Sequence, residues 1–189
     1  MKNKKLVIFG VIALIVVILI ASVAGGYNSL VSARAEVETA QANIQTQLQR
    51  RADLIPNFVS TVKGYADYEQ STYTAVTEAR AAVGKANDTA SLNDAQNRLD
   101  GAISVWVNAV TEAYPDLKAN TSFIALQDEL AGTENRIAVA RKDYNDTAKG
   151  YNTMVLKFPK NILASIFGFE KIDYFEATDD AQSVPQVSF

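Results

Sequence analysis

The sequence predicts an all-α protein, an antiparallel up-down four-helix bundle with one N-terminal transmembrane helix. Residues 6–24 form an uncharged run of 19 residues, LVIFGVIALIVVILIASVA, and the rest of the chain repeats apolar residues at spacings of three, four and seven. Such spacings place apolar side chains on one face of a helix. The sequence contains no run of alternating, β-branched residues bounded by turns, so no strand is expected.

The uncharged run is long enough to cross a bilayer once. As a helix it would measure about 28 Å, close to the thickness of the hydrocarbon layer. Lys2, Lys4 and Lys5 precede it and Arg34 is the first charge after it. The positive-inside rule therefore places the N-terminus in the cytoplasm and the bulk of the chain on the other side. The alternative is a cleaved signal peptide, because residues 22–24 form a small-x-small pattern.

The first two bundle helices are expected on either side of Pro56. Leu30, Val37 and Ile44 recur at intervals of seven, and their helix is expected to end near Asp53. Proline lacks a backbone donor and disfavours helical geometry at the residue before it. The second helix should end near Gly84. Its apolar stripe comprises Phe58, Val62, Tyr65, Val76, Ala79 and Val83.

Two further helices complete the predicted bundle. The third carries an apolar stripe from Leu92 and stops at Tyr114, before a proline, and the fourth runs from about Thr121 to just before Pro159. Four amphipathic helices with short connections bury their stripes against one another, as in an antiparallel bundle. The predicted organisation is therefore an anchor at 1–26, a helical bundle domain at 27–176 and a flexible tail at 177–189.

Composition excludes several classes of function. The chain has no Cys and no His, so it can form neither a disulfide, a thiolate nucleophile, a Ser-His-Asp triad nor a histidine metal site. No Gly-rich phosphate loop is present, and we expect no catalytic residue, metal or cofactor. The 18 basic residues are outnumbered by 21 acidic ones, which argues against a nucleic-acid partner.

An apolar, aromatic segment at 158–175 follows the fourth helix. If successive helices alternate in direction, the segment returns to the membrane surface, and Phe167 and Phe169 become candidate interaction residues. Its apolar side chains could contact the lipid interface or a membrane partner. The simpler interpretation is that they cap the base of the bundle core.

Two carboxylates interrupt predicted apolar faces. Glu69 shares a heptad column with three valines, and Glu134 lies with Arg141 on the flank of the apolar column of the fourth helix. A carboxylate in such a position needs a partner, so these three residues are candidate buried polar groups. An interhelical ion pair that fixes helix register is favoured over a catalytic carboxylate.

A polar cluster is expected at the membrane-distal tip, where the first helix ends. Arg50 and Arg51 suit the negative end of the helix dipole, and Asp53 can cap the next helix. Together with Asn57, these residues form a candidate docking site. The alternative is that they only shape the hairpin between the first two helices.

Three strings resemble the bacterial LemA family: QLQRRADLIPN at 47–57, EAYPDLKAN at 112–120 and the closing PQVSF at 185–189. The resemblance covers nearly everything after the apolar run. It implies one N-terminal membrane segment, an all-helical domain and no established catalytic residue. One departure is visible, because family members often carry His-Glu where this chain has Tyr68 and Glu69.

The resulting hypothesis is a non-enzymatic, membrane-anchored helical scaffold or interaction module facing the extracytoplasmic side of a bacterial inner membrane. Its expected partners are the lipid bilayer and either other proteins or a second copy of the chain. Two alternatives remain open. One is an envelope hydrolase that uses Glu69 and Glu134, and the other is a membrane-shaping protein that acts through 158–175.

Overall fold

The computed structural model describes residues 2–63, 70–86 and 88–176, and within these ranges it contains helices and no strand. The chain divides into two compact units. The first comprises Met1–Thr39 and Asp146–Ile172, and the second comprises Ala40–Asn145 and Asp173–Phe189. The prediction of an all-α protein is therefore confirmed. The tail expected at 177–189 lies outside the described residues.

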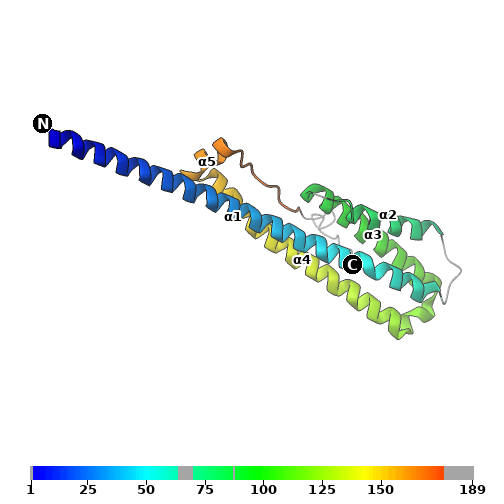
Figure 1. Ribbon diagram of the computed structural model, residues 1–189. Helices are drawn as coiled ribbons and strands as arrows, with labels where there is room; N and C mark the ends of the chain where they lie inside the picture. The colour runs from blue at the N-terminus through cyan, green and yellow to red at the C-terminus, as the bar shows by residue number, and fades with distance from the viewer. Residues whose placement is uncertain (1, 64–69, 87, 177–189) are drawn as a thin grey trace, which may run out of the picture. The chain divides into compact units, whose positions relative to one another are not determined.

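Helix α1 spans Lys2–Lys63, so the apolar run and the first predicted bundle helix form one helix (Figure 1). The predicted end near Asp53 is wrong, because α1 continues through Pro56. Proline inside a helix costs roughly 3 kcal/mol. The residues that follow offset this cost: Phe58 is 1% exposed and Val59 is 5% exposed, and burying each such side chain contributes about 1.5–3 kcal/mol.

Helix α2 spans Gln70–Val83, so the prediction that the second helix begins directly after Pro56 is also wrong. Its predicted end near Gly84 is confirmed. Phe58 belongs to α1 instead, where its ring lies 4.9 Å from Trp106 and 5.0 Å from Phe123, measured between centroids. This aromatic contact joins α1 to two other helices of the second unit and accounts for the continuation of α1.

Helix α3 spans Thr89–Ala113, packs beside α2 and confirms the third predicted helix (Figure 1). A capping box fixes its start: the Ser91 amide donates to Asp88 Oδ1 at 2.7 Å, and the Asp88 amide donates to Ser91 Oγ at 3.1 Å. The backbone hydrogen bond lowers the pKa of Asp88.

A short 3₁₀ helix, η1 at Pro115–Ala119, separates α3 from α4. Helix α4 spans Thr121–Leu156 and confirms the fourth predicted helix. Asn120 supports its first turn, because its Oδ1 accepts a hydrogen bond from the Phe123 amide at 3.1 Å. Side-chain oxygens at this position satisfy amides that the helix itself leaves unbonded.

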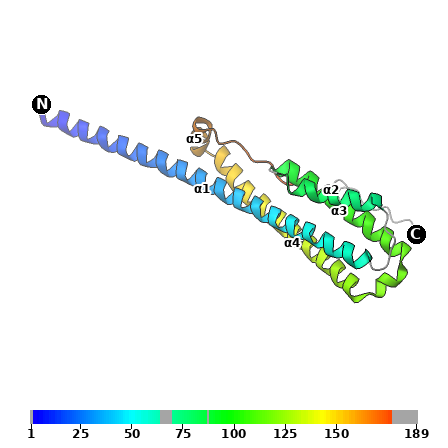
Figure 2. The same cartoon turned by 45° about the vertical axis from the view of Figure 1, so that its right-hand side comes forward.

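In the first unit, the short helix α5 at Lys160–Phe167 lies against α1 (Figure 2). The close approach depends on Gly26, because a Cβ atom there would lie 2.5 Å from Cδ1 of Leu163. Helix α5 ends at Gly168, whose φ of 71° is the left-handed conformation that glycine adopts without strain.

The N-terminal part of α1 has the properties of a membrane span. Among the described residues, α1 is the one helix long and apolar enough to cross a bilayer. Its most apolar window of 18 residues has a mean hydropathy of 3.3, and none of that window is buried. An exposed apolar surface of this size needs a nonpolar environment.

Candidate functional site

Three of the four predicted tip residues line a groove on α1 in the second unit. The groove has a volume of about 760 Å³ and includes Arg50, Asp53 and Asn57. Arg50 pairs with Glu129 at 3.0 Å, and Asp53 pairs with Arg80 at 3.1 Å. These side chains are well exposed to solvent, so each ion pair contributes at most about 1 kcal/mol. The groove is therefore a polar surface that remains accessible.

Arg51, the fourth predicted tip residue, lies on a different side of α1, at a separate cavity. Its side chain is 5% exposed, and its Nη1 lies 2.7 Å from Oδ1 of Asp100 on α3. Its Nη2 lies 3.8 Å from Oε2 of Glu134 on α4. Arg51 therefore connects three helices instead of contributing to the surface groove, and the structure does not bring the four residues together as one site.

A cavity of about 400 Å³ opens beside this arginine. It is bounded by α1, α3 and α4, and Asp100 and Glu134 both line it. Burial raises the pKa of Asp100, and this effect outweighs the opposing influence of the Arg51 guanidinium. The two carboxylates differ in exposure, because the Asp100 side chain is 29% exposed and that of Glu134 is 66% exposed.

The charge arrangement in this cavity favours a structural ion pair. Both carboxylates face one buried guanidinium, which compensates negative charge and ties the helices in one register. Within the described ranges, no group of three or more acidic side chains is placed to hold a metal ion. Glu69, the other predicted buried carboxylate, lies outside the described residues.

Arg141 and Glu134 were expected on the same flank of the fourth helix, but Arg141 contacts other residues. Its Nη2 donates to Asn93 Oδ1 at 3.1 Å and to the carbonyl oxygen of Glu176. Its guanidinium also lies 5.4 Å from the centre of the Phe175 ring, a cation–π geometry. Burial lowers the pKa of Arg141. Within the second unit, Arg141 thus connects α4 to Asn93 on α3 and to residues 175–176.

Two asparagines on α4, which the sequence did not single out, hold the segment that follows α5 in sequence through its backbone. In the first unit, Asn152 donates to the Ile172 carbonyl at 2.8 Å and accepts from the Ile172 amide at 2.9 Å. In the second unit, Asn145 makes the same pair of bonds with Phe175, both at 2.9 Å. Each side-chain amide therefore acts as a neighbouring β-strand would.

Tyr144 adds a further contact to this segment. Its hydroxyl donates to the Asp173 carbonyl at 3.0 Å and lies 2.7 Å from Thr89 Oγ1 on α3. The ring also packs edge-on against Phe175, with centroids 5.0 Å apart. Burial raises the pKa of the Tyr144 hydroxyl. The sequence does carry a signal for these contacts, because the dipeptide Tyr-Asn occurs at 144–145 and again at 151–152.

Phe167 and Phe169, the predicted interaction residues after α4, both contact Tyr27 on α1. Their ring centroids lie 4.9 Å and 5.8 Å from that of Tyr27. Phe167 also borders a largely apolar groove of about 450 Å³. The rest of that groove is formed by α1 residues: Leu19, Ile20, Val23, Ala24, Tyr27 and Asn28. The two rings thus join the segment after α4 to the end of the apolar run.

These features define an all-helical, membrane-associated protein with one apolar N-terminal helix. The LemA family model matches residues 40–189, so the chain belongs to the LemA family. It is 27% identical over 186 residues to magnetosome protein MamQ 2 of Paramagnetospirillum magneticum, covering 85% of this chain and 68% of that protein. It is 25% identical over 156 residues to protein LemA of Metamycoplasma hominis, covering 82% and 71% of the two chains.

A third relative is magnetosome protein MamQ of Magnetospirillum gryphiswaldense, which is 27% identical over 189 residues. The alignment covers 85% of this chain and 70% of that protein.

Proposed function

We propose that the protein is a non-enzymatic interaction module, held by a single N-terminal helix at the extracytoplasmic face of a bacterial inner membrane. The observation that carries the proposal is helix α1, which contains both the exposed apolar segment and buried core residues such as Leu48 and Phe58. One element therefore supplies the anchor and a wall of the folded domain. We assign 1–26 to the anchor, 27–176 to the module and 177–189 to a tail.

The module is best described as an antiparallel up-down four-helix bundle. Contacts of single side chains support this arrangement in the second unit: Arg51 links α1 to α3 and α4, and Arg80 links α2 to α1. Up-down order requires short connections between consecutive helices. The connection from α2 to α3 and the 3₁₀ helix between α3 and α4 satisfy that requirement.

The proposed partner surface is the groove on α1 that includes Arg50, Asp53 and Asn57. It presents charges of both signs, and its volume is the largest of the grooves described above. Mixed charge gives specificity and steering more than affinity. The proposed partner is a protein of the same membrane or a second copy of the chain.

A photo-crosslinking amino acid at position 57 tests this surface in intact cells. We expect a discrete crosslinked product from Asn57 and none from the exposed residue Val139, the control on α4. A crosslink to a second copy would identify a homo-oligomer. Equal, diffuse crosslinking from both positions would contradict the proposal.

The proposed topology can be tested by labelling introduced cysteines, because the chain has no native Cys. A membrane-impermeant maleimide should label Val105→Cys on intact cells, or on spheroplasts if an outer membrane is present. It should label Lys4→Cys only after lysis. The reverse pattern would show that the domain is cytoplasmic. The mass of the purified chain tests whether the N-terminal helix is retained, since signal-peptidase cleavage would remove it.

The alternative of an envelope hydrolase has one supporting observation, the cavity that holds Asp100 and Glu134. We favour the structural role because Arg51 lies within ion-pair distance of both carboxylates. General acid–base catalysis requires a carboxylate that can exchange its proton with a substrate. The membrane-shaping alternative depends on 158–175, where Phe158, Ile162 and Ile166 are exposed.

A further inference from the structure

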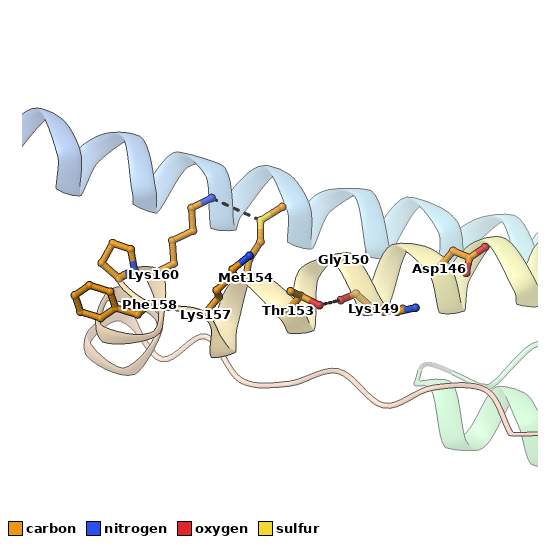
Figure 3. Close-up of a pocket in the computed structure, with 9 residues that line it drawn as sticks. Asp146, Lys149, Gly150, Thr153, Met154, Lys157, Phe158 and Lys160 are labelled. Atoms are coloured by element: carbon orange, nitrogen blue, oxygen red, sulfur yellow. Dashed lines mark hydrogen bonds between the residues drawn. The ribbon is translucent and has the colours of Figure 1, made fainter.

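A basic groove lies in the first unit, at the junction between α4 and α5. It has a volume of about 520 Å³, and its charged residues are Lys149, Lys157, Lys160 and Asp146. Three lysines against one aspartate make the groove electropositive. Figure 3 shows Phe158 and Lys160 at one end of the groove and Asp146 at the other.

Large apolar side chains are exposed beside these lysines. Phe158 is 76% exposed, Ile162 is 51% exposed and Ile166 is 68% exposed. The two isoleucines are four residues apart on α5 and therefore share one face of that helix. Apolar side chains next to lysines are typical of segments that lie in the membrane interface.

The contacts of α5 with α1 indicate how deep these exposed apolar side chains would lie in the bilayer. Leu163 meets α1 at Gly26, and Phe167 meets it at Tyr27. The uncharged run ends at Ala24, so Gly26 is about 3 Å farther along the helix axis. If the run spans the bilayer, α5 lies at the level of the lipid headgroups, where Tyr27 is also expected.

One lysine of the groove is held in place by both helices. Lys160 Nζ lies 2.7 Å from Ser29 Oγ on α1. It also lies 3.8 Å from Met154 Sδ on α4 (Figure 3). Neither of these two partners carries a negative charge that would compete with an external anion for Lys160. Lys149 and Lys157 are exposed and line the same groove.

We propose that this groove binds the headgroup of an anionic phospholipid from the leaflet into which α5 dips. The lysines would contact the phosphate, while Phe158, Ile162 and Ile166 would insert among the upper parts of the acyl chains. An anionic phospholipid is favoured because it combines a phosphate with apolar chains, and the structure presents lysines and exposed apolar groups side by side. The proposal deepens the proposed function and depends on its membrane anchor.

The first test measures insertion of α5 with the full chain in nanodiscs. A bimane label at Ile166→Cys should be quenched by lipids that carry a nitroxide near the headgroup, whereas the same label at Val139→Cys should not be quenched. Val139 is a matched control because it is 52% exposed and apolar. Equal quenching at the two positions would overturn insertion of α5. It would leave the proposed anchor intact, because nanodisc incorporation is measured separately.

The second test measures which anion the groove binds, using the full chain in nonionic detergent. A bimane label at Thr153→Cys, on the groove wall, is titrated with short-chain phosphatidylglycerol, short-chain phosphatidylcholine and inorganic phosphate. Phosphatidylglycerol should bind most tightly. Lys157→Glu should weaken its binding by at least about fivefold, the effect expected for one lysine, and Lys118→Glu on η1 should have no effect.

Three results would overturn the proposal. Equal affinity for the two lipids would exclude selectivity for an anionic headgroup. Binding of inorganic phosphate as tight as that of phosphatidylglycerol would indicate a site for free anions. Equal effects of Lys157→Glu and Lys118→Glu would show that net charge matters and the groove does not.

Discussion

Replacing Arg51 with methionine should destabilise the second unit by about 3 kcal/mol at pH 7. The substitution leaves Asp100 without its counter-ion, and loss of one partner of a buried pair costs roughly 3–5 kcal/mol. The lower end applies because the Asp100 side chain is 29% exposed. Glu134 contributes little to the loss, since its side chain is 66% exposed and its oxygen lies 3.8 Å from Arg51.

Urea unfolding of the full chain in nonionic detergent measures this loss. Trp106 is the only tryptophan, is 4% exposed and belongs to the same unit, so its fluorescence reports on the affected core. The midpoint should fall without a change in slope. In thermal unfolding the same loss corresponds to roughly 6–12 °C. The neighbouring Arg50→Met is the matched control and should cost less than about 1 kcal/mol, because its ion pair is exposed.

Two further measurements separate the ion pair from simple loss of packing. The double variant Arg51→Met with Asp100→Leu should recover most of the stability, because no uncompensated charge remains. The pKa of Asp100 is already raised in the folded state, and loss of Arg51 should raise it further. The folded state of Arg51→Met then favours the protonated carboxyl of Asp100. The contribution of this group to the free energy of unfolding is fully present below the unfolded pKa of 3.8 and is lost as pH rises through the raised pKa. The deficit of Arg51→Met should therefore shrink as pH is lowered from 7. A cost no larger than that of Arg50→Met, or a deficit independent of pH, would refute the reasoning.

The remaining predictions concern packing and backbone contacts. Phe58→Ala should cost about 3–5 kcal/mol in the urea assay, because the ring fills the core that keeps α1 helical beyond its proline; a cost below about 1 kcal/mol would contradict that account. Asn152→Ala removes two hydrogen bonds to Ile172 and should accelerate tryptic cleavage after Lys171. Unchanged cleavage would show that these bonds do not hold the chain around Ile172 in place. Gly26→Leu should displace α5 and expose Lys160 to trypsin. Gly25→Leu is the control and should not do so, because a Cβ atom at Gly25 meets nothing within 4 Å. Equal cleavage of the two variants would contradict close packing at Gly26.

Several elements could be read from local sequence because their signals are local. Apolar spacing and the prolines at 115 and 159 predicted where α3 and α4 end. The capping box that starts α3 at Thr89 was not predicted, and the first apolar residue of that helix was placed at Leu92. The prediction that the helix ends near Pro56 was wrong. A proline inside a helix costs about 3 kcal/mol locally, and burial of side chains against other helices can exceed this cost. The three rings that stabilise this part of α1 come from α1, α3 and α4, far apart in sequence.

The candidate site was predictable only in part. The expected helix end singled out Arg50, Arg51 and Asp53 as candidates, but the sequence could not show which side of α1 each occupies relative to the other helices. Adjacent residues on a helix point about 100° apart, so Arg50 faces solvent while Arg51 faces Asp100. The sequence placed Glu134 and Arg141 together on one flank of the fourth helix, but in the structure Arg141 contacts Asn93 and Phe175.

The sequence by itself determined that the chain is helical, that an uncharged run precedes an amphipathic region, and that thiol and imidazole chemistry is absent. These properties follow from composition and from periodicity along the chain. Only the tertiary structure decided that α1 passes through Pro56, that Arg51 is buried with Asp100, and that asparagine side chains on α4 hold the backbone after α5. Each of these depends on the free energy of contacts between residues distant in sequence, and no local pattern contains that free energy.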